Sequence, residues 1–179
     1  MVFTHHDHVF ALHNVLHSIA SQRKIEAYLE VGVCAGESLH VLLSQQFPDR
    51  LTLCDTWGDQ YGGQAFGDAR HIEWMLNHFK YPNPTTYLNG NSHQMLKKVT
   101  QLFDLITVDG DHSPDGARED LEDCWSLLMP NGLLVFDDIA HEAHPHLSMV
   151  FKDFIDDVNA TVIHEDMTPL GVGVLCKTL

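Results

Sequence analysis

The sequence has few positive charges. Its 179 residues include 10 Lys and Arg against 25 Asp and Glu, which gives a formal net charge of −15 at pH 7. Proteins that bind nucleic acid or anionic membranes use Lys and Arg side chains to replace the counterions of phosphate groups. The charge therefore argues against a nucleic-acid backbone and against a membrane as partners.

Long apolar runs and paired cysteines are missing as well. No apolar stretch approaches the roughly 18 residues of a membrane span, and the start, MVFTHHDHVF, lacks the basic and apolar parts of a signal peptide. The four cysteines, Cys34, Cys54, Cys124 and Cys176, form no C-x-x-C pair and are predicted to be reduced structural thiols. We expect a soluble, cytoplasmic protein with one domain over 1–179.

Histidine is abundant, with 14 residues. The HHDH segment at 5–8 could bind a metal, or its side chains could simply be solvated at the chain end. The second interpretation is favoured because the segment borders the start of an N-terminal helix, predicted for about 7–22.

Apolar runs and helical stripes alternate along the chain. Short strands are predicted at 27–31, 51–54, 85–88, 105–108 and 133–136, with helices between most of them. A Pro-Asn-Gly turn is predicted at 130–132, and two β-rich runs joined by Thr-Pro-Leu-Gly are predicted to form a C-terminal antiparallel hairpin. The pattern predicts a three-layer α/β/α, Rossmann-like fold with a mostly parallel, seven-stranded sheet.

One segment, at about 56–70, has no periodicity and is rich in glycine and aromatic residues. It reads as a lid loop over a site. Trp57, Tyr61 and Phe66 could stack on an adenine or close over a substrate, or they could merely pack the loop down, and both alternatives stay open.

Two of the predicted strands end in aspartates. Asp109 and Asp111 follow one strand, and Asp137 and Asp138 follow the next. The strands and the helix between them form a βαβ unit, which places both strand ends at the sheet edge where open α/β folds bind ligands. Any single aspartate could cap a turn. Four together repel one another, so some are protonated or a divalent cation with oxygen ligands lies among them, and the cation is the simpler interpretation.

A glycine turn, EVGVCAGES at 30–38, follows the first strand. A dinucleotide pyrophosphate needs a G-x-G-x-x-G arrangement, whereas only Gly32 and Gly36 are present, with three residues between them. Glu30 would repel phosphate and attract the ammonium and sulfonium groups of S-adenosylmethionine. Asp55 ends the second strand, where folds of this type bind the ribose hydroxyls of a nucleoside.

The segments EVGVCAGES, CDTWGD, GNS, VDGDHSPDG and VFDDI, in this order, resemble the class I S-adenosylmethionine-dependent methyltransferases. The chain is most similar to metal-dependent small-molecule O-methyltransferases with a DGDH or DGSH motif, a group that includes sugar O-methyltransferases. The resemblance extends from Tyr28 to Cys176 and implies a methyltransferase that uses S-adenosylmethionine.

The resemblance also implies roles for individual residues. The cofactor-binding residues would be Glu30, Gly32, Gly36 and Ser38 for the methionine part, Asp55 for the ribose, and Asn91 with Ser92 for the adenine. The metal ligands would be Asp109, Asp137 and Asp138, with Mg²⁺ as the favoured ion. His112 matches the position of a general base, and Asp111 is the alternative base.

We therefore predict metal-assisted O-methylation of a small hydroxylated molecule. The cation would lower the cost of deprotonating the acceptor, and His112 would accept the proton. A nicotinamide-dependent oxidoreductase and a non-catalytic nucleoside-binding protein remain as alternatives. The acceptor is expected to be selected by 56–70, by the histidine-rich segment 141–146 and by a neighbouring subunit if the protein is a homo-oligomer.

Overall fold

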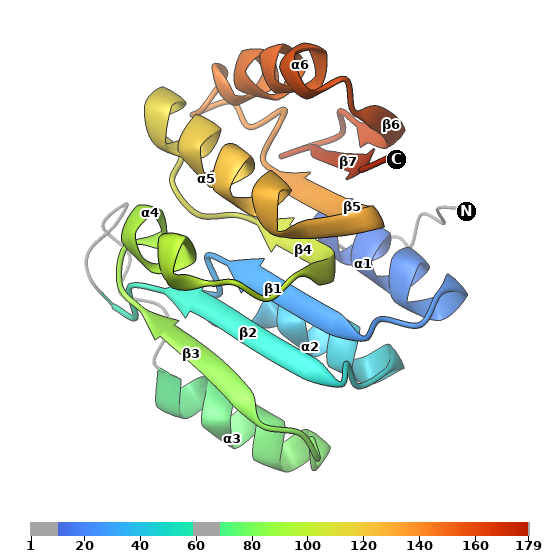
Figure 1. The fold of residues 1–179 in the computed structure, drawn as a ribbon, viewed down its shortest axis with the longest axis vertical. Helices are drawn as coiled ribbons and strands as arrows, with labels where there is room; N and C mark the ends of the chain where they lie inside the picture. Colours follow the sequence, from blue (N-terminus) through green and yellow to red (C-terminus); the bar gives the residue numbers. More distant parts are fainter. Residues whose placement is uncertain (1–10, 59–68, 179) are drawn as a thin grey trace.

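The computed structural model describes residues 11–58 and 69–178. Seven strands form one sheet in the order β3-β2-β1-β4-β5-β7-β6 (Figure 1). The strands are β1 (Ala27–Val31), β2 (Arg50–Asp55), β3 (Thr85–Asn89), β4 (Phe103–Val108), β5 (Leu128–Asp137), β6 (Thr161–Asp166) and β7 (Val172–Cys176). The α-helices are α1 (Ala11–Gln22), α2 (Glu37–Gln45), α3 (Ala69–Phe79), α4 (Ser92–Met95), α5 (Pro114–Leu127) and α6 (Leu147–Val158), and a 3₁₀ turn covers Leu96–Lys98.

The pairing of the strands confirms the predicted fold class. The neighbouring strands from β3 to β5 pair in parallel, whereas β7 pairs antiparallel with both β5 and β6. The chain order reverses at β1, which lies between β2 and β4. Such a reversal opens a crevice at the carboxyl ends of the strands, and ligands bind there in folds of this kind.

Two apolar layers cover the two faces of the sheet. Helices α1, α2 and α3 pack on one face, and α5 and α6 pack on the other (Figure 1). All five residues of β1 are buried, and successive side chains enter opposite layers. Burial on both faces explains why this strand has no polar alternation and was recognisable as a short, mostly apolar run.

The start of α5 shows how closely local sequence determines a helix boundary. Ser113 is the N-cap residue, and its side chain accepts a hydrogen bond of 3.2 Å from the backbone N–H of Gly116. Pro114 occupies the first helical turn, where its missing N–H costs nothing. Both positions agree with the sequence prediction.

The predicted turn at 130–132 is wrong as a strand boundary. Strand β5 begins at Leu128 and continues through this segment, with a register shift in its pairing to β4 and a left-handed backbone at Asn131, where φ is 62°. The residues after β7 stabilise this irregular stretch, because Lys177 N–H donates to Gly132 O and Asn131 N–H donates to Lys177 O. A partner so distant in sequence cannot be read from local turn residues.

Some predictions fall outside the described residues. The helix expected at about 7–22 is described only from Ala11, and the histidines at 5–8 precede that point. Of the aromatic residues in the predicted lid loop, Trp57 is described, whereas Tyr61 and Phe66 are not. Within residues 11–58 and 69–178, no helix has the length and apolar character needed to cross a bilayer.

Candidate active site

A cavity of about 770 Å³ opens at the carboxyl edge of the sheet, where the chain order reverses. Its lining comes from the ends of β1 and β2, from the first residue of α4 and from the segments that follow β1, β2, β3, β4 and β5. The lining residues are Val31, Gly32, Cys34, Cys54, Asp55, Thr56, Gly58, Gly90, Asn91, Ser92, Asp109, Gly110, Asp111, His112, Ser113, Asp138, His141 and His144. The volume is typical of a site for a molecule of nucleoside size.

Gly32 allows two strand ends to meet under this cavity. Its φ is +79°, and an added Cβ atom would overlap the carbonyl oxygen of Asp109. Backbone hydrogen bonds run from Gly32 N–H to Cys54 O (2.9 Å) and from Asp109 N–H to Val31 O (2.8 Å). Only glycine fits at this close approach, so the turn and the first aspartate of the acidic cluster are locked together.

Asp55 fixes the glycine turn through its carboxylate. One oxygen, Oδ2, accepts hydrogen bonds of 2.8 Å from the backbone N–H groups of Val33 and Cys34, and the other, Oδ1, accepts one of 2.7 Å from Trp57 N–H. A carboxylate offers about four acceptor positions. Roughly one therefore remains, on Oδ1, for a ligand in the cavity.

Glu30 lies beneath the cavity and does not line it. Its side chain is completely buried, where Ser38 donates a hydrogen bond to Oε1 and the Tyr28 hydroxyl donates one of 2.9 Å to Oε2. Burial raises the pKa of Glu30 to about 8, although both hydrogen bonds act in the opposite direction. The sequence argument assumed a charged Glu30 at the mouth of the turn, whereas the structure places a carboxyl in the floor where ionisation is unfavourable.

Of the remaining predicted cofactor residues, two line the cavity and two lie behind its lining. Asn91 and Ser92 line the cavity at the start of α4. Gly36 and Ser38 do not line it. Gly36 precedes α2 with φ 78°, and an added Cβ atom would lie 2.6 Å from the Ile72 side chain, so this glycine allows α3 to pack against the turn.

Two aspartates and one histidine form a group that also lines the cavity. His112 Nε2 lies 3.3 Å from Asp109 Oδ1 and 3.4 Å from Asp138 Oδ2. One ligand atom from each of these three residues lies within 4.8 Å of the other two, a spacing that suits a metal ion. Burial raises the pKa of Asp109, and the contact with Asp109 raises the pKa of His112.

The structure separates the two candidate bases. Asp111 turns toward the start of α5, where Oδ1 accepts a hydrogen bond of 2.7 Å from Ser113 N–H, and an added Cβ atom at Gly116 would overlap its carboxyl group. His112 turns toward Asp109 and Asp138 instead. Both residues line the cavity, and the choice of His112 as the base remains a prediction.

Asp137, the third predicted metal ligand, is placed differently from Asp138. It is neither among the cavity-lining residues nor in the Asp109, His112 and Asp138 group. Burial, followed by the charges of Asp109 and Asp138, raises its pKa well above the usual range. Asp137 is thus an electrostatic neighbour of the acidic group, and its role as a ligand remains a prediction.

Three histidines, His112, His141 and His144, line the cavity. The ring of His144 lies 4.8 Å from that of His112 and 5.0 Å from that of His141, measured between centroids. His146 Nε2 lies 2.6 Å from the backbone oxygen of His112. These imidazoles border the space next to the acidic group, where an acceptor would lie.

Sequence reasoning missed a second group of potential ligands, formed by His93, Glu119 and Asp123. The available signal was the spacing of Glu119 and Asp123, four residues apart in one predicted helix, which places both on one helical face. Their proximity to His93 depends on tertiary packing of α4 against α5.

Comparison with known proteins agrees with the fold. A family model described as a methyltransferase domain matches residues 29–139. A sequence comparison with curated proteins gives no match. The family match spans more than half of the chain, and it includes the glycine turn, Asp55 and all four predicted acidic residues.

Solved methyltransferase structures share the fold at low sequence identity. The O-methyltransferase TomG from Streptomyces achromogenes, solved with S-adenosylmethionine, has a TM-score of 0.69 and 21% identity over 92% of this chain and 78% of its own. The N-methyltransferase NodS from Bradyrhizobium japonicum, solved with S-adenosylhomocysteine, has a TM-score of 0.68 and 18% identity over 92% and 85%. An O-methyltransferase from Bacillus cereus, also solved with S-adenosylhomocysteine, has a TM-score of 0.65 and 14% identity over 98% and 84%.

The seven-stranded sheet, its C-terminal hairpin and the cavity at the chain reversal define the class I methyltransferase fold. The chain belongs to the methyltransferase domain family. The sequence-based recognition of a methyltransferase dependent on S-adenosylmethionine is thereby confirmed. The metal-dependent subgroup remains a prediction.

Proposed function

We propose that this methyltransferase transfers a methyl group to a hydroxyl oxygen of a small molecule, with assistance from a divalent cation. The observation that supports this most directly is the convergence of His112 with Asp109 and Asp138 on one wall of the cavity. The glycine turn and Asp55 line the same cavity. A methyl donor bound by the turn and Asp55 would therefore share this cavity with groups that can bind and deprotonate an acceptor.

The residues present fit a cation. Asp109 and Asp138 provide carboxylate oxygens, which are the ligands that Mg²⁺ prefers. Partial burial raises the pKa of Asp109, so a positive partner would favour its ionised form. When bound, a divalent cation would stabilise the negative charge that develops on an acceptor hydroxyl. Asp109 and Asp138 would hold it, with Asp137 as a further candidate.

The chain's own residues would orient the reactants and move the proton. Asp55 has an acceptor position for a ribose hydroxyl, and Asn91 and Ser92 border the part of the cavity assigned to adenine. His112, held between two carboxylates, would take the acceptor proton at Nε2. His141 and His144 would contact the acceptor and contribute to its selection.

The cysteines bear on the cellular compartment, and the glycine turn bears on the alternative of a nicotinamide-dependent oxidoreductase. Cys34, Cys54, Cys124 and Cys176 all lie in the described residues and none is joined in a disulfide there, which fits a reducing compartment such as the cytoplasm. A nicotinamide dinucleotide needs the third glycine that the turn lacks. The fold is shared with an N-methyltransferase, so the acceptor atom must be tested directly.

Two measurements test the proposal. Mass spectrometry of the gently purified protein should find S-adenosylmethionine or S-adenosylhomocysteine bound to it. Methyl transfer to a panel of small hydroxylated and amino compounds, with and without EDTA, should then show metal-dependent methylation of oxygen. Transfer that EDTA leaves unchanged, or that occurs only at nitrogen, would contradict the proposal.

A further inference from the structure

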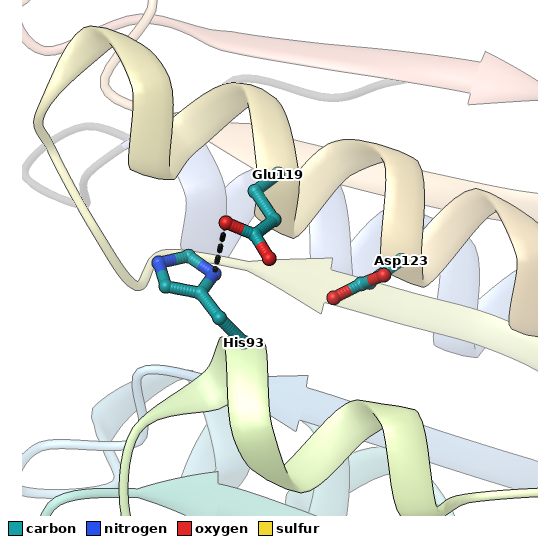
Figure 2. A group of neighbouring side chains, drawn as sticks. All are labelled: His93, Glu119 and Asp123. Atoms are coloured by element: carbon teal, nitrogen blue, oxygen red, sulfur yellow. Dashed lines mark ion pairs between the residues drawn. The ribbon is translucent and has the colours of Figure 1, made fainter.

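A second group of metal-binding side chains lies between α4 and α5, outside the cavity. His93 on α4 points toward Glu119 and Asp123 on the facing side of α5 (Figure 2). One ligand atom from each of the three residues lies within 4.8 Å of the other two. Glu119 and Asp123 are four residues apart, so they stand one helical turn apart on the same face.

Three buried atoms in this cluster make no hydrogen bond within the described part of the chain. They are His93 Nδ1, Asp120 Oδ1 and Asp123 Oδ2. The side chain of Asp120 is fully buried, and its Oδ1 lies 3.3 Å from His93 Nδ1. Buried polar atoms normally have partners. Three buried polar atoms without a hydrogen bond at one place therefore point to a ligand that contacts them together.

The distances from His93 Nδ1 to the neighbouring carboxylate oxygens fit the separation between two ligands of one ion better than the length of a hydrogen bond. Two atoms that each lie about 2.1 Å from a tetrahedral ion are about 3.4 Å apart. The separations of His93 Nδ1 from Asp120 Oδ1 (3.3 Å) and from Glu119 Oε2 (3.8 Å) are close to that value.

The other nitrogen of His93 supports the same assignment. His93 Nε2 lies 3.4 Å from Asp111 Oδ2. An imidazole that donates its Nε2–H to Asp111 presents a lone pair at Nδ1, toward the cluster. Metal-binding histidines commonly have such a carboxylate behind them, because it fixes the tautomer and the ring orientation.

The local charge also calls for a cation. Lys97 Nζ lies 2.6 Å from Glu119 Oε1, which leaves Oε2 of the same carboxylate facing His93. Asp120 and Asp123 add two more carboxyls, each with one buried oxygen that makes no hydrogen bond within the described residues. One lysine cannot neutralise three ionised acids, whereas a divalent ion together with this lysine would do so.

We propose that His93, Glu119 and Asp123, with the buried Asp120 beside them, bind a divalent transition-metal ion, with Zn²⁺ preferred over Mg²⁺. Imidazole with carboxylates suits Zn²⁺, whereas Mg²⁺ favours oxygen ligands alone. The ion joins α4 to α5 and has a structural role. The ion would also hold two cavity-lining residues in place, because Ser92 directly precedes His93 and Asp111 contacts His93. This site does not depend on the proposed reaction.

The test measures Zn²⁺ binding to the full chain in a variant that lacks Asp138, one of the three potential ligands in the Asp109, His112 and Asp138 group. The Asp138→Asn protein, stripped of metal with a chelator, is titrated with ZnCl₂ by calorimetry, and we expect one ion per chain. Adding Glu119→Gln or Asp123→Asn should weaken this binding by at least ~10–100-fold, the loss caused by removing even a residue that only orients a ligand. Adding Glu122→Gln, which removes the same charge from the same helix, should change it by less than about threefold.

Crystals of the unaltered chain soaked in ZnCl₂ should show an anomalous peak between His93 and Asp123. Absence of Zn²⁺ binding by the Asp138→Asn protein would overturn the proposal. Equal Zn²⁺ affinity with and without Glu119→Gln would do the same. Glu119 is 42% exposed, so this variant should fold even if Asp123→Asn does not, and urea unfolding of each variant verifies this.

Discussion

The carboxylate of Asp55 accepts a hydrogen bond of 2.8 Å from the backbone N–H of Cys34, so the acid at the end of β2 holds the turn that follows β1. Cys34 has a left-handed backbone with φ 49°, which is uncommon for a residue other than glycine. The acid therefore stabilises a costly backbone conformation. It is part of the turn as well as a candidate partner for the ribose.

Asp55→Asn should damage both roles. The amide NH₂ group cannot accept a hydrogen bond, so N–H groups of the turn lose their acceptor at a cost of about 1–3 kcal/mol in the free energy of unfolding. We also expect S-adenosylhomocysteine to bind at least about tenfold more weakly. Urea unfolding and calorimetry measure the two effects. Asp49→Asn, at an exposed site, serves as the control, and equal results for the two variants would contradict this assignment.

Glu30→Gln should remove a pH-dependent loss of stability. The pKa of Glu30 is raised from 4.5 to about 8 in the folded protein. Below about pH 4.5 the group is protonated in both the folded and the unfolded state. As the pH rises from there to about 8, the unfolded state releases the proton first, so the folded state loses stability, by a few kcal/mol at most.

Urea unfolding across about pH 5 to 9 measures this difference. The variant should become more stable relative to the unaltered chain as the pH rises, and the difference should level off above about pH 8. Glu26→Gln, at the exposed residue just before β1, is the control. A difference that does not change with pH would show that Glu30 is ionised in the folded protein.

Asp138→Asn should abolish metal-dependent turnover while preserving the fold. Asp138 has a left-handed backbone with φ 63°, a conformation that asparagine tolerates better than most residues. Calorimetry should still detect S-adenosylhomocysteine, because the glycine turn and Asp55 are unchanged. Product formation with added Mg²⁺ and with EDTA is the measurement. Turnover that continues and still responds to Mg²⁺ would remove Asp138 from the metal site.

His112→Gln should lower kcat by ~10²–10⁴, the usual effect of losing a general base. The affinity for S-adenosylhomocysteine should stay unchanged, since His112 is assigned to the acceptor side of the cavity. His78→Gln, at an exposed histidine on α3, is the control. A loss under threefold would instead indicate that His112 only orients Asp109.

The sequence predicted most of the fold because its signals were local. The strand 27–31, the Ser113 cap and the order of the acidic strand ends each depend on a few adjacent residues, and the structure confirms them. The position of Glu30 below the cavity could not be predicted, because it depends on the Tyr28 and Ser38 side chains, which donate hydrogen bonds to the two oxygens of its carboxyl group. The separation of Asp111 from His112 likewise depends on how α5 begins against the preceding loop.

The reversal of chain order at β1 also bears on how such a protein can diversify. The side of the cavity assigned to the methyl donor comes mainly from residues before 93, whereas the side assigned to the acceptor comes from residues after 108. Changes in the later stretch can thus alter which compound is methylated without disturbing the earlier one. A chimera that exchanges 138–146 with a relative would inherit the relative's acceptor and retain its own donor site.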